Sequence, residues 1–150
     1  MADLQTLLSK FLQGLYTSVT PGVGFLVASG RATAQTAAVA SVCTYTPTVD
    51  GSFEVVMNVL VTTSTTHTFT GQCTYTDEGN TARTVTMPFR LVGDTTALTS
   101  SIAASAAVPY NGVPVHIRVK ANTAITLLTQ AAGTYTTVTF NVEGRITQVA

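Results

Sequence analysis

The sequence predicts an all-β protein: a jelly roll or β-sandwich of about eight strands, preceded by one N-terminal amphipathic helix. Beyond residue 30, apolar and polar residues alternate over most of the chain, with turn residues at intervals of roughly ten positions. Thirty of the 150 residues are Thr, a β-branched residue that suits the exposed side of a strand. We therefore expect two parts: an N-terminal helix and arm in residues 1–30 and a β jelly-roll domain in residues 31–150.

The helix is predicted over residues 3–16. Leu4, Leu8, Phe11 and Leu15 are spaced by four, three and four residues, which is the spacing of a coiled-coil seam. Such a helix packs on its own domain, or it joins a sister subunit or docks on a partner. Two heptads are too short to hold chains together alone, so both interpretations remain open.

An arm is expected to follow the helix, because Pro and Gly interrupt residues 17–30 repeatedly. Residues 25–28 form a short apolar strand within it, beginning with Phe25. We count Phe25 with the four helix residues as the candidate contacts to another subunit or to a partner.

A repeat lies at the centre of the chain. Residues 43–46 read Cys-Thr-Tyr-Thr, and the same four residues recur at 73–76. Each copy then continues through a turn into a second alternating segment, which predicts two β-hairpins whose apolar faces pack together. Cys43 and Cys73 occupy equivalent positions and are expected to be neighbours in the sheet. We interpret them as buried free thiols, with a disulfide as the alternative.

The remaining strands follow from the same alternation. Pro88 predicts an edge or a bulge within its strand, because proline has no N–H to donate to a ladder. The strand around residue 117 has one apolar side and one polar side, the latter with His116, Arg118 and Lys120. The expected strands span residues 34–46, 52–63, 67–76, 82–92, 97–108, 113–120, 124–129 and 137–143.

The charge of the chain limits its function. Formal net charge is zero and only 9% of residues are charged, whereas nucleic acids and anionic membranes are bound by clustered Lys and Arg. We expect neither as a partner, and we expect the low charge to favour association with protein. No apolar run approaches the ~20 residues of a membrane helix, and the first residues do not resemble a signal peptide. The chain is expected to be made in a cytoplasm.

Few residues are available for catalysis or metal binding. Asp77, Glu78 and Asn80 could supply oxygen ligands to Ca²⁺, but their spacing is that of a turn and not of a calcium loop. His67 and His116 have no neighbouring ligand residue. No Gly-x-Ser-x-Gly elbow and no paired acids stand out. We expect no enzyme activity, no metal and no cofactor.

Three segments carry a resemblance to a known group of proteins. They are Tyr-Thr-Asp-Glu-Gly-Asn-Thr-Ala-Arg-Thr-Val-Thr at 75–86, Val-Lys-Ala-Asn-Thr-Ala-Ile-Thr at 119–126, and the Thr-rich closing segment 133–143. Over residues 35–145 the chain resembles short β proteins of tailed-phage virions with a jelly roll like that of tumour necrosis factor. Asn122 stands where that pattern has Gly, and both residues accept a left-handed turn.

The resemblance implies a homotrimer that decorates or cements a capsid, without catalytic residues or a cofactor. The expected function is therefore that of a virion structural protein, which binds the outer surface of a phage capsid at junctions between major capsid proteins. Leu4, Leu8, Phe11, Leu15 and Phe25 are the expected contacts. The alternative is a receptor-binding module of a head or tail fibre, which would expose aromatic residues on its loops. The chain has no Trp, and Tyr110 is its one aromatic residue expected in a loop.

Overall fold

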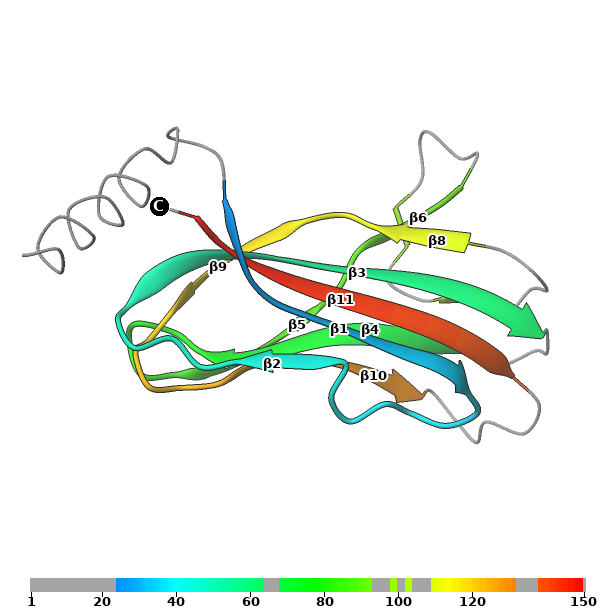
Figure 1. The fold of residues 1–150 in the computed structure, drawn as a ribbon, viewed down its shortest axis with the longest axis horizontal. Helices are drawn as coiled ribbons and strands as arrows, with labels where there is room; N and C mark the ends of the chain where they lie inside the picture. The colour runs from blue at the N-terminus through cyan, green and yellow to red at the C-terminus, as the bar shows by residue number, and fades with distance from the viewer. Residues whose placement is uncertain are drawn as a thin grey trace, which may run out of the picture.

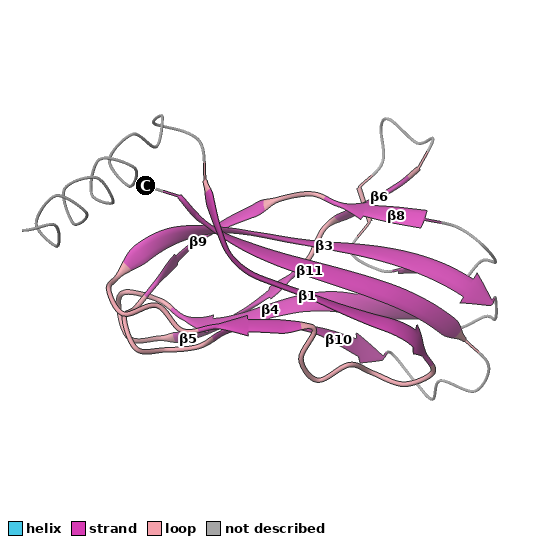
Figure 2. Ribbon diagram, in the orientation of Figure 1, coloured by secondary structure: helices cyan, strands magenta, loops and turns pink. Residues whose placement is uncertain are grey.

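The computed structural model describes residues 24–63, 68–92, 98–99, 102–103, 109–131 and 138–149. These residues form two antiparallel sheets, and no helix lies among them (Figures 1 and 2). The all-β prediction is confirmed for this part of the chain, and the helix predicted over 3–16 lies outside it. The strands are β1 (Phe25–Gln35), β2 (Cys43–Tyr45), β3 (Gly51–Thr63), β4 (Thr68–Thr76), β5 (Ala82–Thr86), β6 (Phe89–Leu91), β7 (Ile102–Ala103), β8 (Pro109–Gly112), β9 (Val115–Val119), β10 (Ile125–Ala131) and β11 (Thr139–Val149).

The two sheets lie face to face as a β-sandwich (Figure 1). Sheet A has the order β1-β11-β3-β8-β6, and β9 pairs with β3 on the same side as β8. Sheet B has the order β2-β10-β4-β5, and the two-residue β7 also pairs with β4. Neighbours in a sheet are mostly distant in sequence, so the sheets are held together by long-range pairing.

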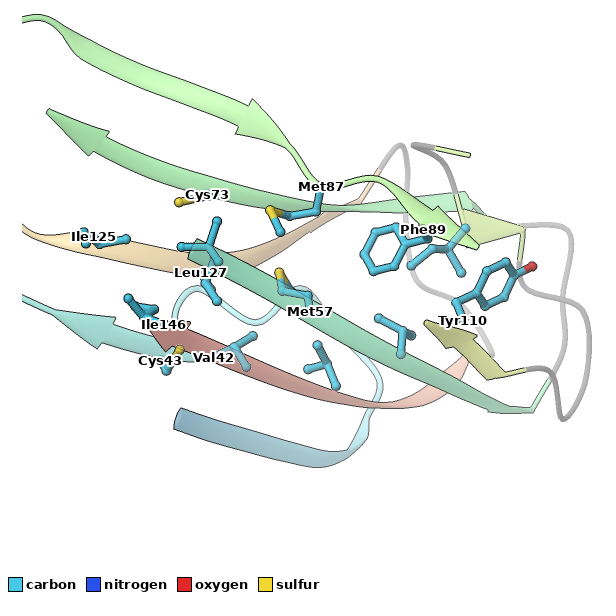
Figure 3. Close-up of a cluster of buried hydrophobic side chains, with 14 of the residues drawn as sticks. Val42, Cys43, Met57, Cys73, Met87, Phe89, Tyr110, Ile125, Leu127 and Ile146 are labelled. Carbon is cyan, nitrogen blue, oxygen red and sulfur yellow. The ribbon is translucent and has the colours of Figure 1, made fainter. Parts of the chain in front are cut away.

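The core lies between the sheets and is built by alternation along the strands (Figure 3). The predicted inward side of β3 is confirmed, because every second residue from Phe53 to Val61 is at most 2% exposed. Full burial of one such side chain contributes about 1.5–3 kcal/mol. Further core residues are Phe89, Ile117, Val119, Phe140, Val142 and Ile146 from sheet A and Cys73, Ile125 and Leu127 from sheet B.

The first copy of the repeat is not a hairpin, contrary to the sequence-based prediction. Its strands β2 and β3 lie in different sheets, and the chain crosses between them. The crossing segment is bonded to the turn after β9: Asp50 Oδ1 accepts the N–H of Ala121 at 2.7 Å, and Pro47 O accepts the N–H of Asn122 at 2.7 Å. These bonds hold residues 47–50 away from the geometry that would close a hairpin.

The second copy is a hairpin, as predicted. β4 and β5 pair from Gln72 to Thr86, and their turn is closed by Asp77, which accepts N–H groups from Asn80 and Thr81. Asn80 takes a φ of 63°, the left-handed conformation that Asn tolerates better than most residues. The Asx and Gly residues of this turn therefore act as the sequence suggested.

The strand expected over 82–92 is divided between the two sheets. β5 belongs to sheet B and β6 to sheet A, and the chain passes between them at Met87 and Pro88. The N–H of Met87 donates to Gly71 O in sheet B, whereas the N–H of Phe89 donates to Thr99 O. Both Met87 and Phe89 are fully buried because the crossing runs through the core. The effect of Pro88 is thus a change of sheet. Of the strand expected over 97–108, the described residues are 98–99, where Thr99 forms an isolated bridge with Phe89, and β7, Ile102–Ala103.

β1 is longer than the short strand expected at 25–28. It pairs with β11 over Phe25–Gln35, so the boundary expected at residue 30 lies inside a strand of sheet A. The prediction of one long strand over 34–46 is wrong. β1 ends at Gln35, next to Ala34 with its φ of 53°, and β2 has only three residues. The chain between them folds back so closely that a Cβ on Gly30 would overlap the carbonyl oxygen of Val42.

Cys43 and Cys73 are buried free thiols, as the favoured interpretation held. They are not neighbours in the sheet, contrary to expectation, because both are paired with Leu127, from the two sides of β10. Two inter-strand spacings, roughly 9–10 Å, therefore separate their Cα atoms, and a disulfide requires less than about 7 Å. Burial raises the pKa of Cys43 to about 11 and, with a smaller effect of Cys43 itself, that of Cys73 to about 12.

Candidate binding surfaces

The outer face of sheet B carries no charged side chain at the outward positions of β2, β10, β4 and β5. One row crosses the whole sheet, because Thr126 of β10 pairs with Thr44 and Thr74 on its two sides and Thr74 pairs with Thr84. This Thr row is flanked by further uncharged residues. The outward residues near it are Gln72, Thr86 and Leu128, followed by Thr70 and Gln130.

Hydroxyl groups at one end of the Thr row bond to one another. Thr44 Oγ1 lies 2.9 Å from Ser41 Oγ and 3.3 Å from Thr126 Oγ1. A hydroxyl that keeps a partner costs little to remove from water, whereas an unpaired polar group costs about 1–3 kcal/mol. The outer face of sheet B can therefore be covered by another surface without the penalty of burying an ion.

The outer face of sheet A is charged. His116 Nε2 lies 3.0 Å from Glu54 Oε2, and Arg145 donates through Nε and Nη2 to Glu143 Oε1 at 2.8 and 2.6 Å. Arg31 is the residue opposite Glu143 on β1. The two outer faces of the sandwich thus differ in chemistry, with the strand charges concentrated on sheet A.

A hollow of about 210 Å³ lies on the outer face of sheet A, over β11 and β3 and bordered by β1 and β8. Two asparagines in it are held by backbone groups. Asn58 Oδ1 accepts the N–H of Gly112 at 3.0 Å, and Asn141 Oδ1 accepts the N–H of Ala34 at 2.8 Å. Among the residues that line the hollow are Arg31, Asn58, Leu60, Pro109, Asn141 and Glu143.

Asp77, one of the acids considered for Ca²⁺, is engaged in its own hairpin. Its Oδ1 accepts the N–H of Thr81 at 2.8 Å, and its Oδ2 accepts Nε of Arg83 at 2.7 Å. The bond from Thr81, followed by the bond from Arg83, lowers the pKa of Asp77. Its oxygens are thus used in closing the turn.

The neighbouring turn residues bind the cations of β9 and the turn after it. Glu78 Oε1 accepts Nη2 of Arg118 at 2.8 Å, and Asn80 Oδ1 accepts Nζ of Lys120 at 2.9 Å. Within the described ranges, no group of three or more His, Cys, Asp and Glu side chains is arranged to hold a metal ion. The polar groups at this end of the sandwich connect the β4–β5 hairpin to β9.

The predicted contact residues fall mainly outside the described part of the chain. Leu4, Leu8, Phe11 and Leu15 lie there, and so does His67. Phe25 is the first residue of β1, opposite Gln148, and is 56% exposed, while Leu26 beside it is 51% exposed. β1 therefore begins with two large exposed apolar side chains.

Comparisons with known proteins give no relative. No protein family, no curated protein and no solved structure matches the chain. Among the described residues, no helix is long and apolar enough to cross a membrane.

Neither the Thr row nor the hollow was identified from the sequence. All four segments contain Thr, and Thr alternates with other residues in β4 and β5, which was a visible signal for the row. Its assembly, however, depends on the order β2-β10-β4-β5. The hollow combines residues from 31 to 143, which come together only through the pairing of β1, β11, β3 and β8.

Proposed function

We propose that this protein is a structural component of a virion: a jelly-roll protein that binds, as a homotrimer, to the outer surface of a phage capsid and stabilises the shell. Its partner is the major capsid protein. The outer face of sheet B and the N-terminal segment, with Leu4, Leu8, Phe11, Leu15 and Phe25, form the contact surface.

The strand pairing supports the jelly roll. β8 and β9 both pair with the same edge of β3 and count as a single strand position, and the short β7 shares the position of β5. β6 is an additional short strand beyond β8, and eight strand positions remain without it. The eight positions then pair as nested antiparallel couples: β1 with β11, β2 with β10, β3 with β8 and β9, and β4 with β5. Nested pairing between two sheets is what two linked Greek keys produce, and this is the plan of a jelly roll.

The uncharged outer face of sheet B is the observation that carries the proposal. Interface centres are depleted in charged residues, because each buried ion must be desolvated. The chain has few charged residues, and its strands carry most of them on sheet A. The outer face of sheet B is therefore suited to permanent contact with another protein. Thr74 and Thr126 stand at the middle of this face, flanked by Thr44 and Thr84.

The size of this face indicates that it needs a second contact. From strand rise and spacing, the four strands cover roughly 400 Å², about half of the ~800 Å² that each partner contributes to a stable interface. The N-terminal segment is proposed to supply the rest. Its apolar residues, repeated over three subunits and many copies, raise the total affinity by multivalency.

Co-sedimentation with undecorated capsids of the virus that encodes the chain tests this function. The intact chain is compared with one lacking residues 1–23, a cut that leaves β1 whole because β1 begins at Phe25. The mass of each form in solution is measured in parallel. We expect the intact trimer to saturate the shells at a symmetric stoichiometry and the shortened form to bind more weakly or to lose its oligomeric state.

The function is refuted if neither form binds capsids although both are folded. Host cells and their surface glycans would then be the next partners to test, since a receptor-binding module of a head or tail fibre is the alternative. If only the shortened form fails while keeping its mass, residues 1–23 contact the shell directly. If it also becomes monomeric, they join the subunits.

A further inference from the structure

The hollow on the outer face of sheet A has the size of a single small ring. Its volume of about 210 Å³ is below the roughly 300–1,000 Å³ of pockets for drug-sized ligands. Leu60, which is 39% exposed, pairs with Pro109 and supplies an apolar patch at one side. A ring with one apolar face and polar substituents fits such a surface.

The amide groups in the hollow are fixed as donors. A backbone N–H only donates, so the atoms that Gly112 and Ala34 contact in Asn58 and Asn141 are the carbonyl oxygens. The two NH₂ groups are consequently left to bond elsewhere, and neither has a partner within the described ranges. Both asparagines line the hollow, so they offer it their N–H groups, while one of the two lone pairs of each Oδ1 is already used.

The local charge favours an anion. Arg145 donates twice to Glu143 Oε1 and thereby compensates its charge. Arg31 lines the hollow opposite Glu143, and its guanidinium group forms no hydrogen bond or ion pair with another residue that the structure describes. Two arginines and one glutamate give a formal charge of plus one. A guanidinium matches a carboxylate in geometry, with two parallel N–H···O bonds.

We propose that this hollow binds one sugar unit that carries a carboxylate, such as a hexuronate. The ring lies on Leu60 and Pro109, the NH₂ groups of Asn58 and Asn141 donate to its hydroxyl oxygens, and Arg31 binds its carboxylate. The site is separate from the proposed capsid contact on sheet B and does not depend on it.

Titration of the ¹⁵N-labelled full chain with D-glucuronate, followed by NMR, tests the site. We expect saturable shifts of the side-chain amide signals of Asn58 and Asn141, with a Kd on the order of 1 mM for so small a ligand. D-glucose, which has no carboxylate, should bind at least tenfold more weakly.

Two variants are expected to weaken glucuronate binding at least tenfold. Arg31→Gln removes the cation. Asn58→Asp keeps an oxygen to accept the N–H of Gly112 but replaces the NH₂ donors with negative charge. The matched control is Arg83→Gln, which removes an exposed arginine on β5 in the other sheet and should leave the Kd unchanged.

Several results would overturn the assignment. These are the absence of saturation about tenfold above the expected Kd, equal affinity for glucose, or wild-type affinity in either Arg31→Gln or Asn58→Asp. Equal weakening by Arg83→Gln would also overturn it, because it would show an unspecific attraction between glucuronate and surface arginines. None of these outcomes bears on capsid binding.

Discussion

Replacing Gly71 with Ala tests how closely the two sheets approach in the core. Gly71 lies on β4 in sheet B, and a Cβ there would be 2.7 Å from Cζ of Phe89 and 3.2 Å from Sδ of Met57, both in sheet A. Phe89 and Met57 are 0% exposed, so neither has open space to move into. The added methyl group must therefore displace a packed ring or strain β4.

The size of the effect can be worked out from two opposing terms. Overpacking a core position costs about 1–3 kcal/mol, while alanine restricts the unfolded chain and returns about 0.4–1 kcal/mol. The expected net loss is about 1–2 kcal/mol, or a decrease in Tm of roughly 2–8 °C for a domain of this size. Urea unfolding measures the free energy, and an unchanged slope would show that the surface exposed on unfolding is unchanged.

The control is Gly79→Ala in the β4–β5 turn. Its Cβ would lie 3.3 Å from Oδ1 of Asp77, whose side chain is partly exposed at the surface and outside the core, so we expect a change within about 0.5 kcal/mol. The Phe89→Leu substitution should cost less in the Gly71→Ala protein than in the wild type, by at least about 0.5 kcal/mol, because the two residues are in contact. This packing would be refuted if the Gly71→Ala protein were as stable as the wild type. It would also be refuted if the free-energy changes of Gly71→Ala and Phe89→Leu were additive in the double variant.

Three further predictions concern the described core and turn. Leu127→Ala should lower the free energy of unfolding by about 2–5 kcal/mol in urea titrations, because Leu127 is fully buried between Cys43 and Cys73; a loss below 1 kcal/mol would contradict its position. With thiol pKa values near 11 and 12, the native protein at pH 8 should resist a thiol reagent, and both cysteines should react in urea; rapid native labelling would be the contrary result. The pKa of Asp77 is lowered from 3.8 on folding, so its stabilising effect is present above that pH and is lost as the pH falls through the lower folded value. Asp77→Asn should therefore make stability less dependent on pH below about 4, and an unchanged acid dependence would show that Asp77 does not contribute.

The sequence predicted the side chains that form the core better than it predicted strand pairing. Alternation alone identified the inward residues of β3 and β9 and those of β11 up to Val142, because apolar spacing directly records which face is buried. β11 continues to Val149, and its buried residue Ile146 was not predicted. The β4–β5 hairpin was also predicted, since its partners are close in sequence and its turn has Asp77, Gly79 and Asn80. These features depend on local chemistry.

The errors concern where the chain changes sheet. β2 and β3 were predicted to form a hairpin because their residues resemble those of β4 and β5. The bonds that separate them come from Ala121 and Asn122, which lie some seventy residues further along the chain. The division at Met87 and Pro88 was equally hidden, because a buried crossing residue continues the alternation of a strand.

The candidate surfaces also depend on long-range strand pairing, which the sequence does not reveal. The Thr row requires four segments to align in register, and the hollow requires Arg31 to lie beside residues more than a hundred positions away. Composition indicated that little charge is available to keep molecules apart, but only the strand order shows that uncharged outward residues gather on sheet B. Leu4, Leu8, Phe11 and Leu15 remain predicted contacts.

Binding of a matched pair of lysine variants to undecorated capsids tests the central claim most directly. Thr74→Lys places a charge in the middle of the Thr row, and Thr33→Lys places the same charge on an exposed Thr of β1 in sheet A. If the outer face of sheet B is buried against the shell, Thr74→Lys should bind at least tenfold more weakly than the wild type, while Thr33→Lys should bind like it. Equal saturation of the shells by both folded variants would contradict the claim.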